Sequence, residues 1–207
     1  MSDDTKTRIL DAAERLFADA GIDATSLRAI TAEAGANLAA VNYHFGSKEA
    51  LVGEVYGRRI DPLNRERIDR LQMALRDAGD GVPSLPAIVE AFVAPAMLAM
   101  QDPDAGRSFI RLVGRAHTEA SADVRRIVFT RFQDVALAFQ KALARALPQL
   151  DRSTVQARFK FMIGAMAYAM TDPTACAGPS ERDVHRSLDR LVRFLVGGLQ
   201  APTGEEK

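Results

Sequence analysis

Residues 25–48, TSLRAITAEAGANLAAVNYHFGSK, contain the signals of two short helices joined by a tight turn. Thr25 or Ser26 can cap the first helix, because a side-chain oxygen there accepts hydrogen bonds from amides that lack helical partners. Gly35 is expected to end that helix in a left-handed conformation, and Asn37 can cap the second. A helix, a short turn containing glycine and a second helix form the outline of a helix-turn-helix.

The second helix of this stretch has an unusual outer face. Val41 and Phe45, four residues apart, are expected to point inward. The outer face then consists of Ala39, Ala40 and Tyr43. A solvated helix usually carries long charged residues there, whereas small side chains let a helix enter a DNA groove and touch thymine methyl groups. The pattern favours DNA binding, but an ordinary three-helix packing unit with an alanine-rich surface would show it too.

This stretch belongs to a longer motif, in which T-S-x-x-x-I is followed by A-G and then by V-x-Y-H-F-x-x-K-x-x-L. The first 60 or so positions resemble the DNA-binding domain of the TetR family of bacterial transcriptional regulators. The residues that carry the resemblance are these motif residues together with Ile9, Ala12, Ala13, Leu16, Phe17, Gly21, Ile30, Ala34 and Leu51. Asn42 departs from the pattern, because the family most often has a phosphate-binding tyrosine there. Residues 37–48 also resemble the PsrA-like branch, whose members respond to long-chain fatty acids or their acyl-CoA esters.

The resemblance implies a homodimeric regulator, a repressor in the manner of the family. Each subunit would place the helix at 37–44 in the major groove of a palindromic double-stranded DNA operator, with the two grooves about one turn apart. The expected phosphate contacts are Thr25, Ser26, Arg28, Tyr43, His44 and Lys48. The expected apolar base contacts are Leu38, Ala39 and Ala40, and Asn37 and Asn42 can form hydrogen bonds with DNA.

The charge of the chain gives no support to nucleic-acid binding. The formal net charge is zero, and the first 60 residues hold seven Lys or Arg against nine Asp or Glu. Any DNA affinity must therefore come from local placement of a few cations, such as Arg28 and Lys48, and from helix N-termini aimed at phosphates. The rival interpretation is a helical module that binds a small molecule or a protein, without sequence-specific DNA binding.

The whole chain is expected to be all-α, because it shows no strand-like alternation longer than a few residues. We divide it into a three-helix DNA-binding domain, residues 1–60, and a helical ligand-binding and dimerisation domain, residues 61–207. Pro62 is expected to kink or restart the helix that begins near Lys48. One long helix is expected from Ser121 to Leu147.

The last two helices are expected to form a dimer interface. Residues 161–170 are apolar on every side, which predicts a helix that is covered on all sides. Gly164 and its neighbouring alanines leave room for close helix approach. Two such helices from each subunit would make a four-helix interface, although the same helices could complete the core of a monomer.

The middle helices could hold a hydrophobic small-molecule effector. Ligand sites in helical proteins lie between helices and are largely apolar, and methionine suits a cavity for a flexible chain. The candidate lining residues are Phe92, Met97, Met100, Phe109, Val113, His117, Phe132, Met162 and Met166. A solid core would use the same residues, so the expectation of a fatty acid or acyl-CoA effector rests on the resemblance.

No residues indicate catalysis, a metal site or a cofactor. The histidines are scattered, and the chain lacks a Gly-x-Ser-x-Gly elbow, a phosphate loop and a Cys-x-x-Cys motif. Cys176 is the single cysteine, which excludes an intrachain disulfide. The N-terminus is acidic, and the longest apolar run, 161–170, is about half the length that a bilayer crossing needs. We therefore expect a cytoplasmic protein that is not an enzyme and does not enter a membrane.

Overall fold

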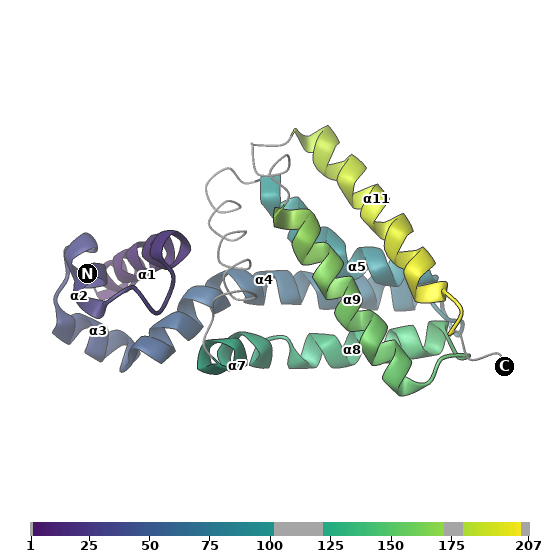
Figure 1. Cartoon of the computed structure of the whole chain (residues 1–207), viewed down its shortest axis with the longest axis horizontal. Helices are drawn as coiled ribbons and strands as arrows, with labels where there is room; N and C mark the ends of the chain where they lie inside the picture. The colour runs from purple at the N-terminus through teal and green to yellow at the C-terminus, as the bar shows by residue number, and fades with distance from the viewer. Residues whose placement is uncertain (1, 102–121, 172–179, 204–207) are drawn as a thin grey trace. The chain divides into compact units, whose positions relative to one another are not determined.

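The computed structural model describes residues 2–101, 122–171 and 180–203, and every regular element in these ranges is helical (Figure 1). The elements are α1 (Ser2–Ala20), α2 (Leu27–Glu33), α3 (Leu38–Phe45), α4 (Lys48–Asp77), α5 (Leu85–Leu98), the 3₁₀ helix η1 (Ala99–Gln101), α7 (Ala122–Thr130), α8 (Gln133–Ala146), α9 (Arg152–Thr171) and α11 (Glu181–Gln200). The prediction of an all-α fold is confirmed. None of the described helices is long and apolar enough to cross a bilayer.

The described helices form two compact units. The first contains α1, α2, α3, the part of α4 that ends at Pro62, and α7. The second contains α4 from Leu63 onward, α5, η1, α8, α9 and α11. Helix α7 lies in the first unit, although its residues fall within the range 61–207 that the sequence assigns to the ligand-binding domain.

The first unit is built around a core of fully buried apolar side chains. Its members from α1 to α4 are Ile9, Ala12, Ala13, Phe17, Ile30, Val41, Leu51 and Val55. The Ser26 hydroxyl accepts a hydrogen bond from the Ala29 amide, and the Asn37 side chain accepts one from the Ala40 amide. Gly35 has a φ of 58°, which suits glycine and separates α2 from α3. The predicted caps and the tight turn are therefore confirmed.

Of the two predicted effects of Pro62, a kink or a restart of the helix, the restart is wrong, because α4 continues through Pro62 as one helix. Proline removes one helical hydrogen bond and costs about 3 kcal/mol inside a helix. Pro62 lies on the exposed side of α4, whereas Ile60 and Asn64 on either side of it are buried. We attribute the continuity of α4 to the packing of these flanking residues, which offsets the local cost.

The single long helix predicted from residue 121 to 147 is also wrong, because α7 ends at Thr130 and α8 starts at Gln133. The Thr130 hydroxyl donates to the Arg126 carbonyl at 2.8 Å, a contact that disturbs a helix locally. A turn follows, in which the Phe132 amide donates to the Phe129 carbonyl at 3.0 Å. The apolar stripe read as continuous thus belongs to two helices that lie in different units.

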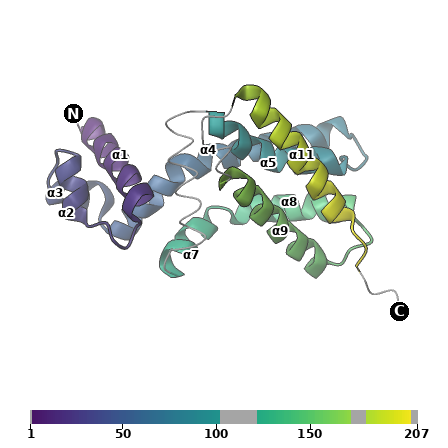
Figure 2. The same cartoon turned by 45° about the horizontal axis from the view of Figure 1, so that its top comes forward.

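The second unit is centred on aromatic rings from three helices. Phe92 of α5 packs edge-on against Phe139 of α8 and Phe159 of α9, with centroid distances of 5.0 and 5.1 Å. Helix α5 is buried almost all round, and α11 packs along α5 and α9 (Figures 1 and 2). This arrangement makes α5 the central helix of the unit and leaves one side of α9 and α11 at its surface.

Candidate nucleic-acid interface

Helix α3 has the two faces that the sequence predicts. Val41 is fully buried and Phe45 is 8% exposed, so both anchor the helix to the core of the first unit. Tyr43 is 82% exposed and Leu38 is 44% exposed, so both side chains lie at the surface of the first unit. The other outward residues of α3 are Ala39 and Asn42, which are exposed, and Ala40 and His44, which are half-buried.

The two caps near α3 keep hydrogen-bonding capacity at the surface. The Asn37 side-chain oxygen accepts from the Ala40 amide at 2.9 Å, and because Asn37 is exposed its NH₂ group faces solvent. The Ser26 oxygen accepts from the Ala29 amide at 3.1 Å, and its hydroxyl proton can still be donated. Both side chains thus combine a structural role with a donor that a phosphate or a base edge can accept.

Thr25 differs from the other predicted phosphate contacts because its side chain is inside the first unit. It is 3% exposed, and its hydroxyl donates to the Gly21 carbonyl at 2.7 Å. The Leu16 carbonyl lies 3.3 Å from the same hydroxyl. Thr25 therefore fixes the loop after α1 and positions Ser26, the cap of α2, at the surface.

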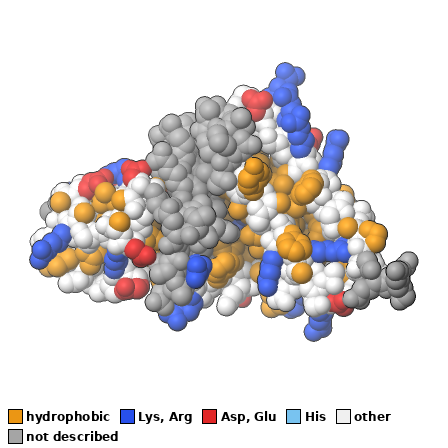
Figure 3. All heavy atoms as spheres, viewed as in Figure 1, with side chains coloured by type: hydrophobic (Ala, Val, Ile, Leu, Met, Phe, Trp, Pro, Cys, Tyr) orange, Lys and Arg blue, Asp and Glu red, His pale blue; other side chains and the backbone are white. Residues whose placement is uncertain are grey.

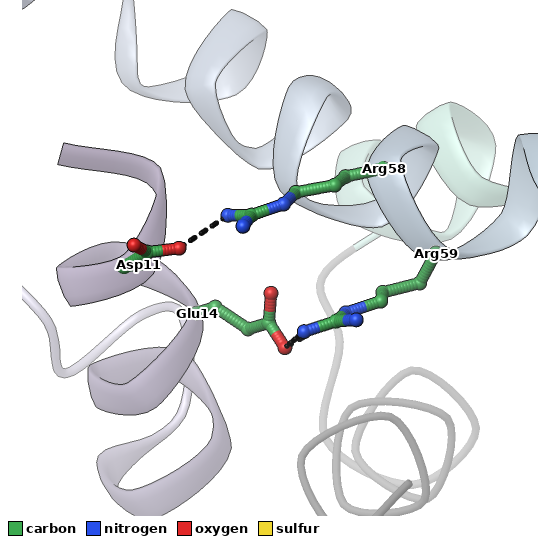
Figure 4. A network of polar contacts seen from close by, with 4 residues as sticks. All are labelled: Asp11, Glu14, Arg58 and Arg59. Atoms are coloured by element: carbon green, nitrogen blue, oxygen red, sulfur yellow. Dashed lines mark hydrogen bonds and ion pairs between the residues drawn. The ribbon is translucent and has the colours of Figure 1, made fainter. Parts of the chain in front are cut away.

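Most cations of the first 60 residues are engaged by carboxylates of the same unit. Among the described side chains of this stretch there are five ion pairs: Lys6–Glu54 (3.3 Å), Arg8–Asp4 (3.6 Å), Arg15–Glu33 (2.9 Å), Arg58–Asp11 (2.5 Å) and Arg59–Glu14 (2.8 Å). Figure 4 shows the last two, which join α1 to α4. Of the seven cations in this stretch, only Arg28 and Lys48 form no ion pair with a described residue.

The start of α4, next to α3 in sequence, is capped by its own side chains. The Ser47 hydroxyl oxygen accepts from the Ala50 amide at 3.1 Å. Hydrogen bonds from the Glu49 amide and from Ser47 lower the pKa of the Glu49 carboxyl. The half-buried Lys48 stands between these two residues, so its ammonium group is the local positive charge available to a phosphate.

The residues predicted to line an effector site divide into three groups. Five are buried in the second unit: Phe92, Met97, Met100, Met162 and Met166. Phe132 is half-buried and belongs to the first unit. Phe109, Val113 and His117 lie outside the described residues. A groove of about 550 Å³ between the end of α4 and the start of α5 is lined by other residues, among them Met73, Val82 and Ala87.

Arg67 is a buried charged residue that the sequence analysis did not single out. It is 1% exposed, and desolvation lowers its pKa to about 10. Helical periodicity could have found it, because the buried residues Ile60, Asn64, Arg67 and Leu71 are spaced by four, three and four positions along α4. The signal for a buried arginine is therefore its position in this inward-facing stripe, and the composition of the segment does not show it.

One face of α9 and α11 is rich in uncovered apolar side chains (Figure 3). Phe161 and Tyr168 of α9 are 73% and 77% exposed, and Phe194 of α11 is 70% exposed. The prediction that α9 is covered on all sides therefore fails for a single chain. Rings of this size that remain in water are typical of a surface that another protein covers.

Among the described residues, no group of three His, Cys, Asp or Glu side chains is placed to hold a metal ion.

Comparisons with known proteins agree with this architecture. Residues 9–55 match the family model of bacterial regulatory proteins of the tetR family, and residues 90–198 match the model of the tetracyclin repressor-like C-terminal domain. Among curated protein sequences, none matches this one significantly.

Solved structures share the fold at low sequence identity. A TetR-family transcriptional regulator from Streptomyces coelicolor, SCO4454, is 21% identical, with a TM-score of 0.60 and 95% of each chain covered. GusR of Salmonella enterica is 18% identical, with a TM-score of 0.61 and coverage of 95% of this chain and 96% of that one. The fatty acid degradation regulator FadR from Bacillus halodurans is 15% identical, with a TM-score of 0.66 and coverage of 96% and 97%.

Proposed function

The chain belongs to the TetR family of bacterial transcriptional regulators, and from this we infer that it is a homodimeric repressor whose two α3 helices enter neighbouring major grooves of a palindromic operator. Proteins of this family are non-enzymatic DNA-binding regulators, and this chain is a DNA-binding transcriptional regulator. Repression, dimerisation and a small-molecule effector are typical of the family, and each is proposed here for this chain.

The pattern of ion pairs carries the proposal. A DNA-binding domain with more carboxylates than cations repels DNA unless a few of its positive charges lie next to the phosphates. In the described part of the first 60 residues, the two cations outside ion pairs are Arg28 of α2 and Lys48 of α4. These elements directly precede and follow α3, so their charges can hold the two phosphate strands that border one groove.

The remaining contacts follow from the exposed face of α3 and its flanks. We assign phosphate contacts to Ser26, Arg28, Tyr43, His44 and Lys48, since hydroxyl, imidazole and cationic groups are the usual phosphate ligands. Leu38, Ala39 and Ala40 supply apolar contacts to bases, and Asn37 and Asn42 can bond to base edges or phosphates. Thr25 acts by holding Ser26 in place, because its own hydroxyl is buried.

The dimer is assigned to the uncovered face of α9 and α11. Phe161, Tyr168 and Phe194 would be buried in a four-helix interface with a second copy, which removes their apolar surface from water. Phe161→Glu should convert the dimer to a monomer in size-exclusion chromatography with light scattering, because it places a charge in the apolar centre. Leu137→Glu, at an exposed apolar position of α8, is the matched control and should stay dimeric.

The effector is proposed to be a hydrophobic small molecule, such as a fatty acid or an acyl-CoA. Buried methionine side chains of the second unit, such as Met97 and Met162, are adaptable and would suit a flexible apolar chain. One protein of the same fold is a fatty acid degradation regulator. An effector of this kind switches the repressor only through a difference in affinity between its DNA-bound and released forms.

A binding titration with DNA from upstream of the protein's own gene tests the function. The wild-type dimer should bind this duplex much more tightly than a scrambled duplex in a fluorescence anisotropy assay. Ala39→Glu should abolish operator binding and leave the dimer folded, because a carboxylate on the groove face meets the bases. Ala20→Glu, at the exposed end of α1, is the control and should bind normally.

Operator binding by the Ala39→Glu variant would show that α3 is outside the groove. Failure of the wild-type protein to bind any duplex would instead favour the rival function, a helical module for a small molecule or a protein. The near-neutral charge of the first 60 residues is the observation that speaks for that rival.

A further inference from the structure

The groove between the end of α4 and the start of α5 lies entirely within the second unit. Its volume of about 550 Å³ is within the range of sites that bind small organic molecules. Alanines of both helices line it, among them Ala74 and Ala87, and their short side chains leave space between the helices. None of the five buried residues assigned to the effector lines this groove, so it is a separate candidate site.

The loop that closes one end of the groove is held in place by hydrogen bonds. The Gly81 amide donates to the Ala78 carbonyl at 2.9 Å, and Arg145 of α8 donates to the Gly81 carbonyl at 3.1 Å. Gly79 has a φ of 56°, a conformation that favours glycine. These features fix the course of the loop, so the wall that Val82 contributes to the groove is pre-formed.

Two large apolar side chains of the groove are in contact with water. Met73 of α4 is 54% exposed, and Val82 of the loop is 48% exposed. A molecule that occupies the groove would cover this apolar surface, which favours binding. The methionine side chain is flexible and can adapt its shape to a ligand. The groove therefore suits a ligand with an apolar body.

The unpaired charge along the groove is negative. Asp77 of α4 and Glu90 of α5 are exposed and line the groove from different helices. Neither carboxylate forms an ion pair with a described residue. Arg70, the cation of the described lining, is engaged by Glu66, because its Nε and Nη2 both lie 2.8 Å from one oxygen of that carboxylate.

The start of α5 does not reverse the sign of this charge. A helix N-terminus attracts anions through amides that lack helical partners. The second residue of α5 is Pro86, which has no amide hydrogen, and the Ser84 hydroxyl oxygen accepts from the Ala87 amide at 3.4 Å. Few amides are thus left for an anion, and the two carboxylates determine the charge that a ligand meets.

We propose that this groove binds a small organic cation, an ammonium ion attached to an apolar body. The ammonium group pairs with the carboxylates of Asp77 and Glu90, and the apolar body packs on Met73 and Val82. Opposite charges attract more strongly in a partly desolvated groove than in water, so the site selects a cation over a neutral molecule of the same shape. This inference goes beyond the proposed function, because it adds a second small-molecule site that does not depend on DNA binding.

The test follows the methyl group of Met73 by NMR in full-length protein with isotope-labelled methionine methyl groups. The signal of Met73 is assigned by its loss in Met73→Leu. Three probes share a phenylbutyl body: 4-phenylbutylamine is a cation, 4-phenylbutan-1-ol is neutral and 4-phenylbutanoate is an anion. The amine should shift the Met73 signal with an affinity about tenfold higher than that of the alcohol, the effect of charge-assisted contacts, and the anion should bind more weakly than both.

Two isosteric changes at exposed positions test the carboxylates without disturbing the core. Asp77→Asn combined with Glu90→Gln should lower the affinity for the amine about tenfold and leave the affinity for the alcohol unchanged. Asp80→Asn removes an exposed carboxylate of the loop that does not line the groove, and this matched control should keep the preference for the amine. All titrations are made at about 0.15 M salt, which screens distant charges.

Equal affinities of the amine and the alcohol at Met73 would overturn the proposal. A preference that survives the double change, or the absence of a Met73 shift with any probe, would overturn it too. Operator binding is not part of this measurement, so a negative result here leaves the proposed function intact, and failure to bind an operator leaves the groove intact.

Discussion

The guanidinium of Arg59 donates two hydrogen bonds, of 3.0 and 2.8 Å, to a single carboxylate oxygen of Glu14 (Figure 4). Glu14 is 4% exposed, so this contact neutralises a buried charge and ties α1 to α4. The adjacent pair, Arg58 with Asp11, joins the same two helices at 2.5 Å but is much more exposed. Both pairs therefore join α1 to α4, and they differ in how deeply they are buried.

Loss of the buried pair should cost far more than loss of the exposed one. Arg59→Ala leaves the Glu14 carboxylate buried without its cation, and we expect a destabilisation of about 2 kcal/mol or more. Arg58→Ala removes a solvated pair, and about 0.5 kcal/mol is expected. Urea unfolding followed by circular dichroism measures both. Equal losses in the two variants would show that burial of Glu14 does not set the strength of this contact.

The operator affinity should depend only weakly on salt. With Arg28 and Lys48 as the phosphate-binding cations, a dimer makes four such contacts, and the logarithm of the binding constant should fall with the logarithm of salt concentration with a slope of about −3.6. Arg28→Ala or Lys48→Ala should each flatten the slope by about 2, because each change removes two contacts per dimer.

Lys6→Ala is the matched control for the salt experiment. Lys6 is paired with Glu54, so its removal should leave the slope unchanged. A wild-type slope of about −7 or steeper would mean that further cations bind phosphates, and would contradict the assignment of two contacts per subunit.

Gly57 and Arg131 should be energetically coupled. A Cβ atom on Gly57 would collide with the Arg131 guanidinium, which is bonded to Asp61 at 2.5 Å. Gly57→Ala should raise the free energy of unfolding by about 1 kcal/mol, because alanine favours the helix over glycine. The same change should displace Arg131 and break its ion pair with Asp61, which lowers the free energy of unfolding by about 0.5 kcal/mol. In an Arg131→Ala background the same change should show the full gain. A double-mutant cycle in urea gives the coupling, and strict additivity would contradict it.

Asp151 should make the stability of the second unit depend on pH in the acid range. Hydrogen bonds from Ser153 and Thr154 lower the pKa of the Asp151 carboxyl to about 2. The carboxylate therefore stabilises the start of α9 fully above about pH 4, the pKa of an aspartate in the unfolded chain. This stabilisation is lost as the pH falls toward 2. Asp151→Asn should therefore unfold at lower urea concentration than the wild type at pH 6, about two units above the unfolded pKa, and the difference should vanish near pH 2. A difference that is independent of pH would contradict this assignment.

The sequence predicted the parts of the fold that depend on neighbouring residues. Ser26 and Asn37 cap the helices because their side chains reach amides three positions away, and Gly35 turns the chain without help from distant groups. The inward position of Val41 and the outward position of Tyr43 follow from helical geometry alone. These local rules also located the candidate DNA-binding face.

The features that sequence reasoning missed depend on distant contacts. Pro62 continues a helix because residues on both sides of it are buried, and the break after Thr130 coincides with a bond from Arg131 to Asp61, seventy positions earlier. Arg67 was not singled out, because composition does not reveal which face of α4 the second unit covers. An apolar run such as 161–170 likewise does not distinguish a buried helix from one that needs a second copy.

The ion pairs that Lys and Arg form with carboxylates of the first unit also affect how the protein binds non-specific DNA. A regulator that offers few unneutralised cations is held loosely by the millions of irrelevant base pairs around its target, so few copies are sequestered there. We therefore expect it to reach its operator mainly by diffusion through solution, with short excursions along the double strand.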